Sequence, residues 1–221
     1  GSCAQYCSYI EYIVRAINQP WNQSDSSSLF YYSMDYGNVH WIALANEHSS
    51  TMMGNPNTTE FRWLEADLQK AAAARARGDI SWIFTVLHYP TMASNVKSPG
   101  GYCTSLPHTY SCAVNCTQDA TSLHFEDLLH KYGVDIMFTG HSHQYERTTP
   151  VYRYENQSSS SNSFLDPAHT IFVNTGSAGN MEVESGWLEP RPPWSVGLRG
   201  GPLQFGFGEV RAEGNRRVLF R

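Results

Sequence analysis

Long hydrophobic runs are absent from the sequence, and the longest one, at residues 80–87, has only the length of a strand. Because about 18 apolar residues are needed to cross a bilayer, no membrane-spanning segment is expected. An excess of basic residues is absent too: the formal net charge is −5, which argues against binding to nucleic acid or to an anionic membrane. No signal peptide is recognisable, and a start at Gly1-Ser2-Cys3 is typical of a processed or tagged chain.

Cysteine is scarce, and its number is odd. The chain has five, so at least one has no partner within the chain: Cys3, Cys7, Cys103, Cys112 and Cys116. The four-residue spacings at both ends of this set fit half of a structural zinc site as well as disulfides. Disulfides are favoured because four glycosylation sequons lie in Ser- and Thr-rich stretches, at Asn22, Asn57, Asn115 and Asn156. Together these features predict an oxidising location: the secretory pathway, the cell surface or a lysosome- or vacuole-like compartment.

Helical periodicity is clearest at residues 59–77 and 120–132, and a glycine follows each segment, Gly78 and Gly133. For the first of these helices, Asn57 is the expected N-cap, with Glu60 reaching back to it. A third helical pattern covers residues 3–18. With 41% apolar and 16% charged residues, the chain can bury a sizeable core around these helices.

Nearly continuous apolar runs predict strands buried on both faces, at residues 80–87, 134–138 and 170–173. Aromatic and β-branched residues around short turns predict two hairpins, formed by residues 29–36 with 39–46 and by residues 205–212 with 216–220. Helices that alternate with strands and are followed by hairpins predict an α/β fold with a mixed sheet.

Three histidines come directly after two of the predicted buried strands. His88 follows residues 80–87, and His141 and His143 follow residues 134–138 within Gly140-His141-Ser142-His143. Since ligands of open α/β sheets bind beyond the carboxyl ends of the strands, these loops should share one rim. A single histidine at a strand end is more often a hydrogen-bonded rim residue. The His-x-His spacing, however, lets two imidazoles serve two metal ions about 3.5–4 Å apart, so the three together predict a metal site.

The motifs around these histidines resemble the metallophosphoesterase superfamily and, within it, the purple acid phosphatases. Thr85-Val86-Leu87-His88 is similar to a V-x-x-H element and Gly140-His141-Ser142-His143 to a G-H-x-H element. The continuation Gln144-Tyr145-Glu146-Arg147 is similar to the purple acid branch in particular. The first hairpin and the closing strand also resemble segments of that family, so the resemblance covers residues 31–220.

The resemblance implies a four-layer αββα sandwich with mixed sheets. Residues 1–221 would be the carboxy-terminal part of a calcineurin-like metallophosphoesterase domain. The resemblance also implies a dinuclear centre of Fe(III) with Zn, Mn or Fe(II). In this centre, His88 and His141 would bind the divalent metal and His143 the ferric ion. The family's substrate-facing histidine would be His108, the nearest candidate in the following loop. The implied reaction is hydrolysis of phosphate monoesters, with phosphodiesters possible.

The family's earlier elements, G-D-x-G, G-D-x-x-Y and G-N-H-[DE], do not occur in the chain. Gly37-Asn38-Val39-His40 has its histidine one place late for the third element, so Asn38 is interpreted as a turn residue and His40 as a strand residue. Neutral imidazoles cannot offset the charge of a metal pair, so anionic ligands must come from elsewhere. The expected partners are a phosphate ester and the missing amino-terminal half or a companion chain, without which we expect poor metal binding and no turnover.

Two other interpretations stay open. The chain could belong to a secreted glycoprotein that kept a phosphatase-like fold and has a binding or structural role without catalysis. It could also belong to a phosphodiesterase of the sphingomyelinase kind, which shares the G-H-x-H element but matches Tyr145-Glu146-Arg147 less well.

Overall fold

The computed structural model describes eleven parts of the chain: residues 19–45, 56–88, 90–94, 120–153, 155–156, 164, 167–179, 186–187, 189–200, 204–215 and 217–220. The helix expected at residues 3–18 lies outside these parts. A short 3₁₀ helix, η1 (Pro20–Gln23), precedes the first strand. None of the described helices is both long and apolar enough to cross a membrane.

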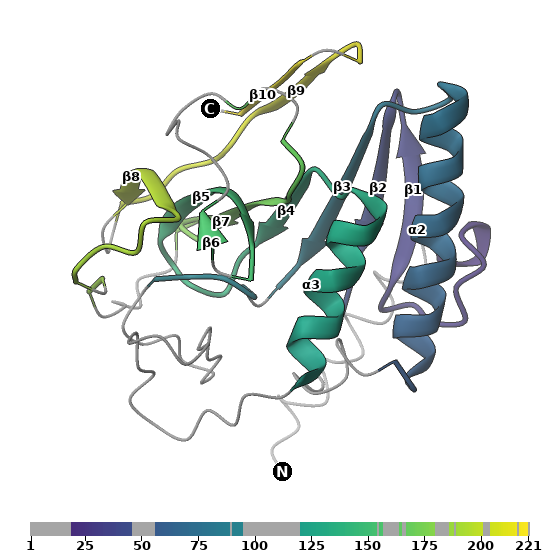
Figure 1. Cartoon of the computed structure of the whole chain (residues 1–221), viewed down its shortest axis with the longest axis horizontal. Helices are drawn as coiled ribbons and strands as arrows, with labels where there is room; N and C mark the ends of the chain where they lie inside the picture. Colours follow the sequence, from purple (N-terminus) through teal and green to yellow (C-terminus); the bar gives the residue numbers. More distant parts are fainter. Residues whose placement is uncertain are drawn as a thin grey trace.

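The described residues form an eight-stranded mixed sheet in the order β1-β2-β3-β4-β7-β5-β6, with β8 paired to β5 (Figure 1). Strands β2, β3, β4 and β7 run parallel, and the other pairings are antiparallel. The strands are β1 (Tyr32–Tyr36), β2 (Val39–Ala43), β3 (Trp82–Leu87), β4 (Ile136–Thr139), β5 (Tyr145–Tyr152), β6 (Glu155–Asn156), β7 (Ile171–Thr175) and β8 (Ser195–Gly200).

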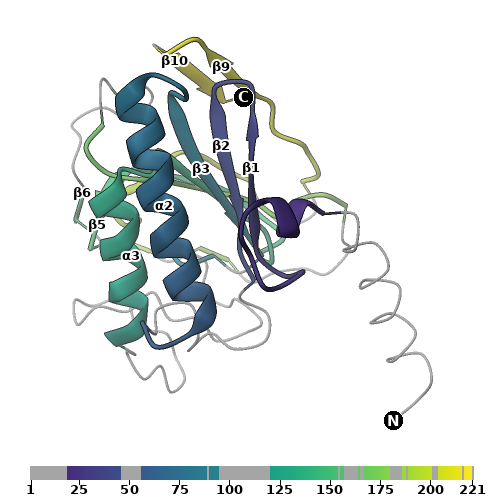
Figure 2. The same ribbon diagram turned by 90° about the vertical axis from the view of Figure 1, so that its right-hand side faces the viewer.

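Two helices, α2 (Thr59–Arg77) and α3 (Ala120–Tyr132), lie side by side on one face of the sheet, as Figure 2 shows. The main core lies between them and the strands, where apolar side chains of both layers are fully buried: Ile42, Ile83 and Met137 from the sheet, and Leu64, Leu68 and Leu129 from the helices. Burial of each such side chain stabilises the fold by about 1.5–3 kcal/mol. These contacts join the helix layer to the sheet.

The other face of the sheet is covered by a hairpin of β9 (Val210–Glu213) and β10 (Arg217–Phe220). Val210, Val218 and Phe220 of this hairpin pack against a second cluster that includes Phe84 and Phe138. The cover is partial, because Val86 on the same strand as Phe84 is 38% exposed. The prediction that residues 80–87 are buried on both faces was therefore wrong at the carboxyl end of the strand.

The predicted boundaries of both helices are confirmed, but the expected cap of α2 was wrong. Thr58 is the N-cap, and its Oγ1 accepts a hydrogen bond from the Phe61 N–H. Glu60 does not reach back to the cap, because its Oε1 accepts from the Ala45 N–H at 2.9 Å. Gly78 ends the helix as predicted, with a left-handed φ of 83° that residues with a Cβ rarely adopt.

Candidate functional site

The loops that carry His88 and the His-x-His pair meet at one rim of the sheet, as predicted. Strands β3 and β4 are parallel neighbours and are paired in register at Leu87 and Thr139, so they end at the same level. The Gly140 N–H then donates to the carbonyl oxygen of His88 at 2.9 Å, which ties the two loops together beyond the strands. Strand register and direction, together with this hydrogen bond, therefore bring His88 and His141 to one place.

The imidazoles of His88 and His141 face each other closely. Nε2 of His88 lies 3.2 Å from Nδ1 of His141, and the ring planes are 73° apart. Two nitrogens bound tetrahedrally to one metal ion at 2.0–2.1 Å would be about 3.3 Å apart, so the observed spacing suits a shared ion. It also suits a hydrogen bond between the rings. His143, which lies two residues further along the loop, is half-buried.

His141 has a positive φ of 55°, a conformation that is uncommon for residues other than glycine. A left-handed backbone costs a residue with a Cβ about 1–2 kcal/mol. The surrounding loop has to supply this energy, and the Ser142 N–H contributes by donating to the Gly140 carbonyl at 2.6 Å. Such local strain is typical of functional loops.

Gly176, which follows β7, provides the surface on which this loop rests. A Cβ at Gly176 would come within 1.8 Å of the Ser142 carbonyl oxygen and 2.6 Å of its carbon. Both atoms belong to the backbone, so no side chain could rotate out of the way. The histidine loop can therefore take its observed course only against a glycine.

Gly176→Ala should consequently displace the histidine loop and lower the free energy of unfolding by about 1–3 kcal/mol, the usual cost of overpacking. Urea unfolding and the NMR signals of the His88 and His141 rings would measure the two effects. Gly206→Ala is the matched control, because a Cβ there meets nothing within 4 Å. Equal stabilities and unchanged ring signals for both variants would contradict the close contact.

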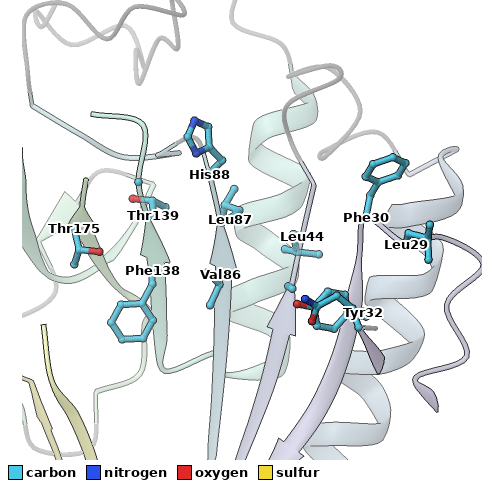
Figure 3. Close-up of a pocket in the computed structure, with 13 residues that line it drawn as sticks. Leu29, Phe30, Tyr32, Leu44, Val86, Leu87, His88, Phe138, Thr139 and Thr175 are labelled. Atoms are coloured by element: carbon cyan, nitrogen blue, oxygen red, sulfur yellow. The ribbon is translucent and has the colours of Figure 1, made fainter. Parts of the chain in front are cut away.

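A cavity of about 550 Å³ opens beside His88 at the carboxyl ends of the strands. Figure 3 shows His88 at its edge, with Val86 and Phe138 lining it below and the hydroxyls of Thr139 and Thr175 nearby. Apart from these polar groups, its lining is mainly apolar, with Leu29, Phe30, Leu44 and Leu87 among its residues. A hollow of this composition suits an apolar segment of protein better than a charged phosphate.

Within the described parts of the chain, no three or more His, Cys, Asp or Glu residues lie close enough together to hold a metal ion. His88 and His141 thus fit part of a donor set. His108 and the five cysteines fall outside the described residues, as does Asn115. Asn22 in η1 and Asn57 before α2 are exposed, whereas Asn156 belongs to the short strand β6.

Comparison with known proteins identifies relatives of this fold, although no model of a protein family matches the chain. "Acid phosphatase type 7" of Mus musculus is 35% identical over 174 residues, which cover 75% of this chain and 37% of that protein. "Purple acid phosphatase 15" of Arabidopsis thaliana is 30% identical over 163 residues, covering 74% of this chain and 24% of that protein. The chain thus spans about a quarter to a little over a third of their length.

Among solved structures, the purple acid phosphatase PPD1 from yellow lupin (Lupinus luteus) seeds superposes with a TM-score of 0.66 at 22% identity. The match covers 88% of this chain and 30% of the lupin chain. It confirms the predicted α/β fold with a large mixed sheet. The chain is therefore a homologue of the purple acid phosphatases, matched over most of its own length.

Proposed function

We propose that the protein containing this chain hydrolyses phosphate monoesters at a dinuclear metal centre. His88 and His141 would bind a divalent ion, and His143 the ferric ion of an Fe(III) centre with Zn, Mn or Fe(II). The observation that carries the proposal is the 3.2 Å approach of His88 Nε2 to His141 Nδ1 beyond two neighbouring parallel strands. Relatives named as acid phosphatases support the class of reaction.

The loops of this chain would hold the histidine side chains in place and leave them accessible to substrate. Neutral imidazole is the form that binds these metals, and the exposed side of His88 leaves room for a phosphate ester. When bound, a metal pair supplies Lewis-acid stabilisation of phosphoryl oxygens and lowers the pKa of water. A histidine acid would protonate the leaving alcohol, and His108 is the candidate for that role.

The remaining ligands would come from the larger part of the full-length protein. Neutral imidazoles cannot offset the positive charge of a metal pair, so carboxylate ligands are needed as well. The described residues at this rim do not supply them. The apolar cavity beside His88 and the exposed Val86 favour a further layer of protein over this face. The same polypeptide, or a companion chain, would cover the cavity and bring anionic ligands to the rim. The exposed sequons at Asn22 and Asn57 favour passage through the secretory pathway.

Metal analysis combined with phosphatase assays on the full-length protein tests this proposal. We expect two metal ions per protein and hydrolysis of p-nitrophenyl phosphate that is lost with a chelator and restored by metal. Bis(p-nitrophenyl) phosphate separates the phosphodiesterase alternative, which would turn this substrate over faster. A folded protein that holds no metal and hydrolyses neither ester would instead support the glycoprotein without catalysis.

A further inference from the structure

The side chain of Asn174, at the rim end of β7, contacts the loop that carries His141 and His143. Its Nδ2 donates to the carbonyl oxygens of Ser142 at 3.1 Å and Gln144 at 2.7 Å, which lie on either side of His143. Its Oδ1 accepts a hydrogen bond from the Thr139 hydroxyl at 3.3 Å. Asn174 is only 3% exposed, so these bonds are shielded from water.

We propose that Asn174 is a positioning residue for the histidine ligands, fixing their loop through its side-chain amide. The inference rests on the proposed metal centre. It follows from the sheet: β4 and β7 are parallel neighbours, and Thr139 is paired with Asn174 in register. The amide therefore stands where the chain leaves β4 and turns into the histidine loop.

The chemistry of the three bonds is specific to asparagine. Two N–H donors and one oxygen acceptor are needed at once, and of the side chains of this size only a carboxamide has them. Aspartate has nearly the same shape but cannot donate, and it would place a negative charge against two carbonyl oxygens. A buried carbonyl that loses its donor costs about 1–3 kcal/mol, which the loop would relieve by moving.

The amide acts together with the backbone of Gly176, on which Ser142 rests. Between these two supports the loop has little freedom, and His141 is held in its strained backbone conformation. Groups that orient metal ligands in this way typically contribute 10–100-fold to metal affinity. Asn174 is buried, and the bonds of its Nδ2 go to the backbone on either side of His143, so its effect on the ligands would pass through the histidine loop.

Asn174→Asp in the full-length protein tests the role. We expect Zn²⁺ affinity, measured against a competing chelator, to fall about 10–100-fold. The decrease in kcat should be larger than any change in KM, and the circular dichroism spectrum should be unchanged. Asn174→Thr, which keeps one hydroxyl donor, should be intermediate. Thr139→Val removes only the bond to Oδ1 and should cost less than either. Wild-type Zn²⁺ affinity in both Asn174 variants would overturn the proposal.

Hydrogen exchange on the metal-free protein gives a second, independent measurement. Asn174→Asp should speed exchange at residues 140–144 while leaving β3 and β7 protected. Unchanged protection of the loop would overturn the positioning role whether or not metal binds. A wild-type protein that binds no metal would instead refute the proposed function, so the two failures are distinguishable. Should Asn174→Asp fail to fold, exchange in Asn174→Thr decides in the same way.

Discussion

Replacing His143 with alanine in the full-length protein should remove one of two bound metal ions and lower kcat/KM for a phosphate monoester more than 100-fold. The loss should exceed the roughly 10–100-fold typical of groups that only orient a ligand, because a ligand itself would be gone. His143 lies on the same short loop as His141, whose Nδ1 is 3.2 Å from Nε2 of His88. The remaining pair should retain one ion, so the variant should hold about half of the wild-type metal.

Metal content measured by mass spectrometry, with activity on the same sample, distinguishes loss of a ligand from loss of the fold. His130→Ala is the matched control, since His130 lies in the last turn of α3 and stacks on His169, away from the rim. That variant should keep both ions. Full metal content in His143→Ala would exclude His143 as a ligand.

The elements that the sequence predicts best are those whose hydrophobic pattern is local. Both helices were predicted with the bounds that the structure gives them, because their apolar positions recur at the helical period and glycines follow. Strand β5 was missed for the opposite reason. Its buried residues include Glu146, Thr148 and Thr149, so the strand has little apolar signal, and it also contains Pro150.

The polar residues of β5 can be buried because distant segments satisfy them. Glu146 accepts hydrogen bonds from the Ser94 N–H at 2.7 Å and from the Ser195 hydroxyl at 2.5 Å, partners about 50 residues away on either side. Thr148 accepts from the Phe172 N–H at 2.9 Å on β7. No sequence pattern within residues 145–152 predicts these contacts. Strand β8, which pairs with β5 and supplies Ser195, was missed along with it.

The histidines could likewise be placed from local sequence, whereas the contacts of Asn174, which supports their loop, could not. His88 and His141 could be placed together because each follows a strand, and parallel strands end at a common edge. Asn174 also follows a predicted strand, but a polar residue there says nothing of its partners until the order of β4 and β7 is known. The N-cap of α2 differs in kind: Asn57 and Thr58 both suit a cap, and only the backbone decides between them.

Several carboxyl groups bind protons more readily than usual in the folded chain. Burial raises the pKa of Glu60 to about 7, although the Ala45 N–H donates to it. Burial likewise raises the pKa of Glu126 to about 7. For Asp135, burial outweighs the nearby Arg75 and raises the pKa to about 6. Each of these groups is therefore costly to ionise within the fold.

His40 on β2 has its pKa shifted in the same direction by a different cause. Burial disfavours the charged ring, but hydrogen bonds and charges from Asp67 and Asp35 outweigh that effect and raise the pKa. Its Nε2 lies 2.9 Å from Asp67 on α2 and its Nδ1 lies 2.6 Å from Asp35 on β1. The protonated ring thus joins the first hairpin to the helix layer. His169 has the opposite shift, since burial and His130 lower its pKa.

The free energy of unfolding should consequently fall as the pH rises from 5 to 8. A raised folded-state pKa adds stability that is fully present below the unfolded value and is lost as the pH rises through the folded one. For the two glutamates this window runs from 4.5 to about 7, for Asp135 from 3.8 to about 6, and for His40 upward from 6.5. At about 1.4 kcal/mol per pKa unit, and allowing for partial exposure and the opposing His169, we expect a loss of about 3 kcal/mol.

Urea unfolding followed by circular dichroism at pH 5, 6, 7 and 8 measures this loss. Glu60→Gln keeps an oxygen to accept the Ala45 N–H but cannot ionise, so it should reduce the decline by about 1 kcal/mol and raise stability most at pH 8. Glu65→Gln, at a half-exposed carboxylate that pairs with Lys131, should leave the slope nearly unchanged. A stability that increases toward pH 8, or a slope insensitive to Glu60→Gln, would contradict the inferred cost of ionising these buried groups. The expected decline places the most stable form of the chain on the acidic side of neutrality, because the folded state holds protons there that the unfolded state releases.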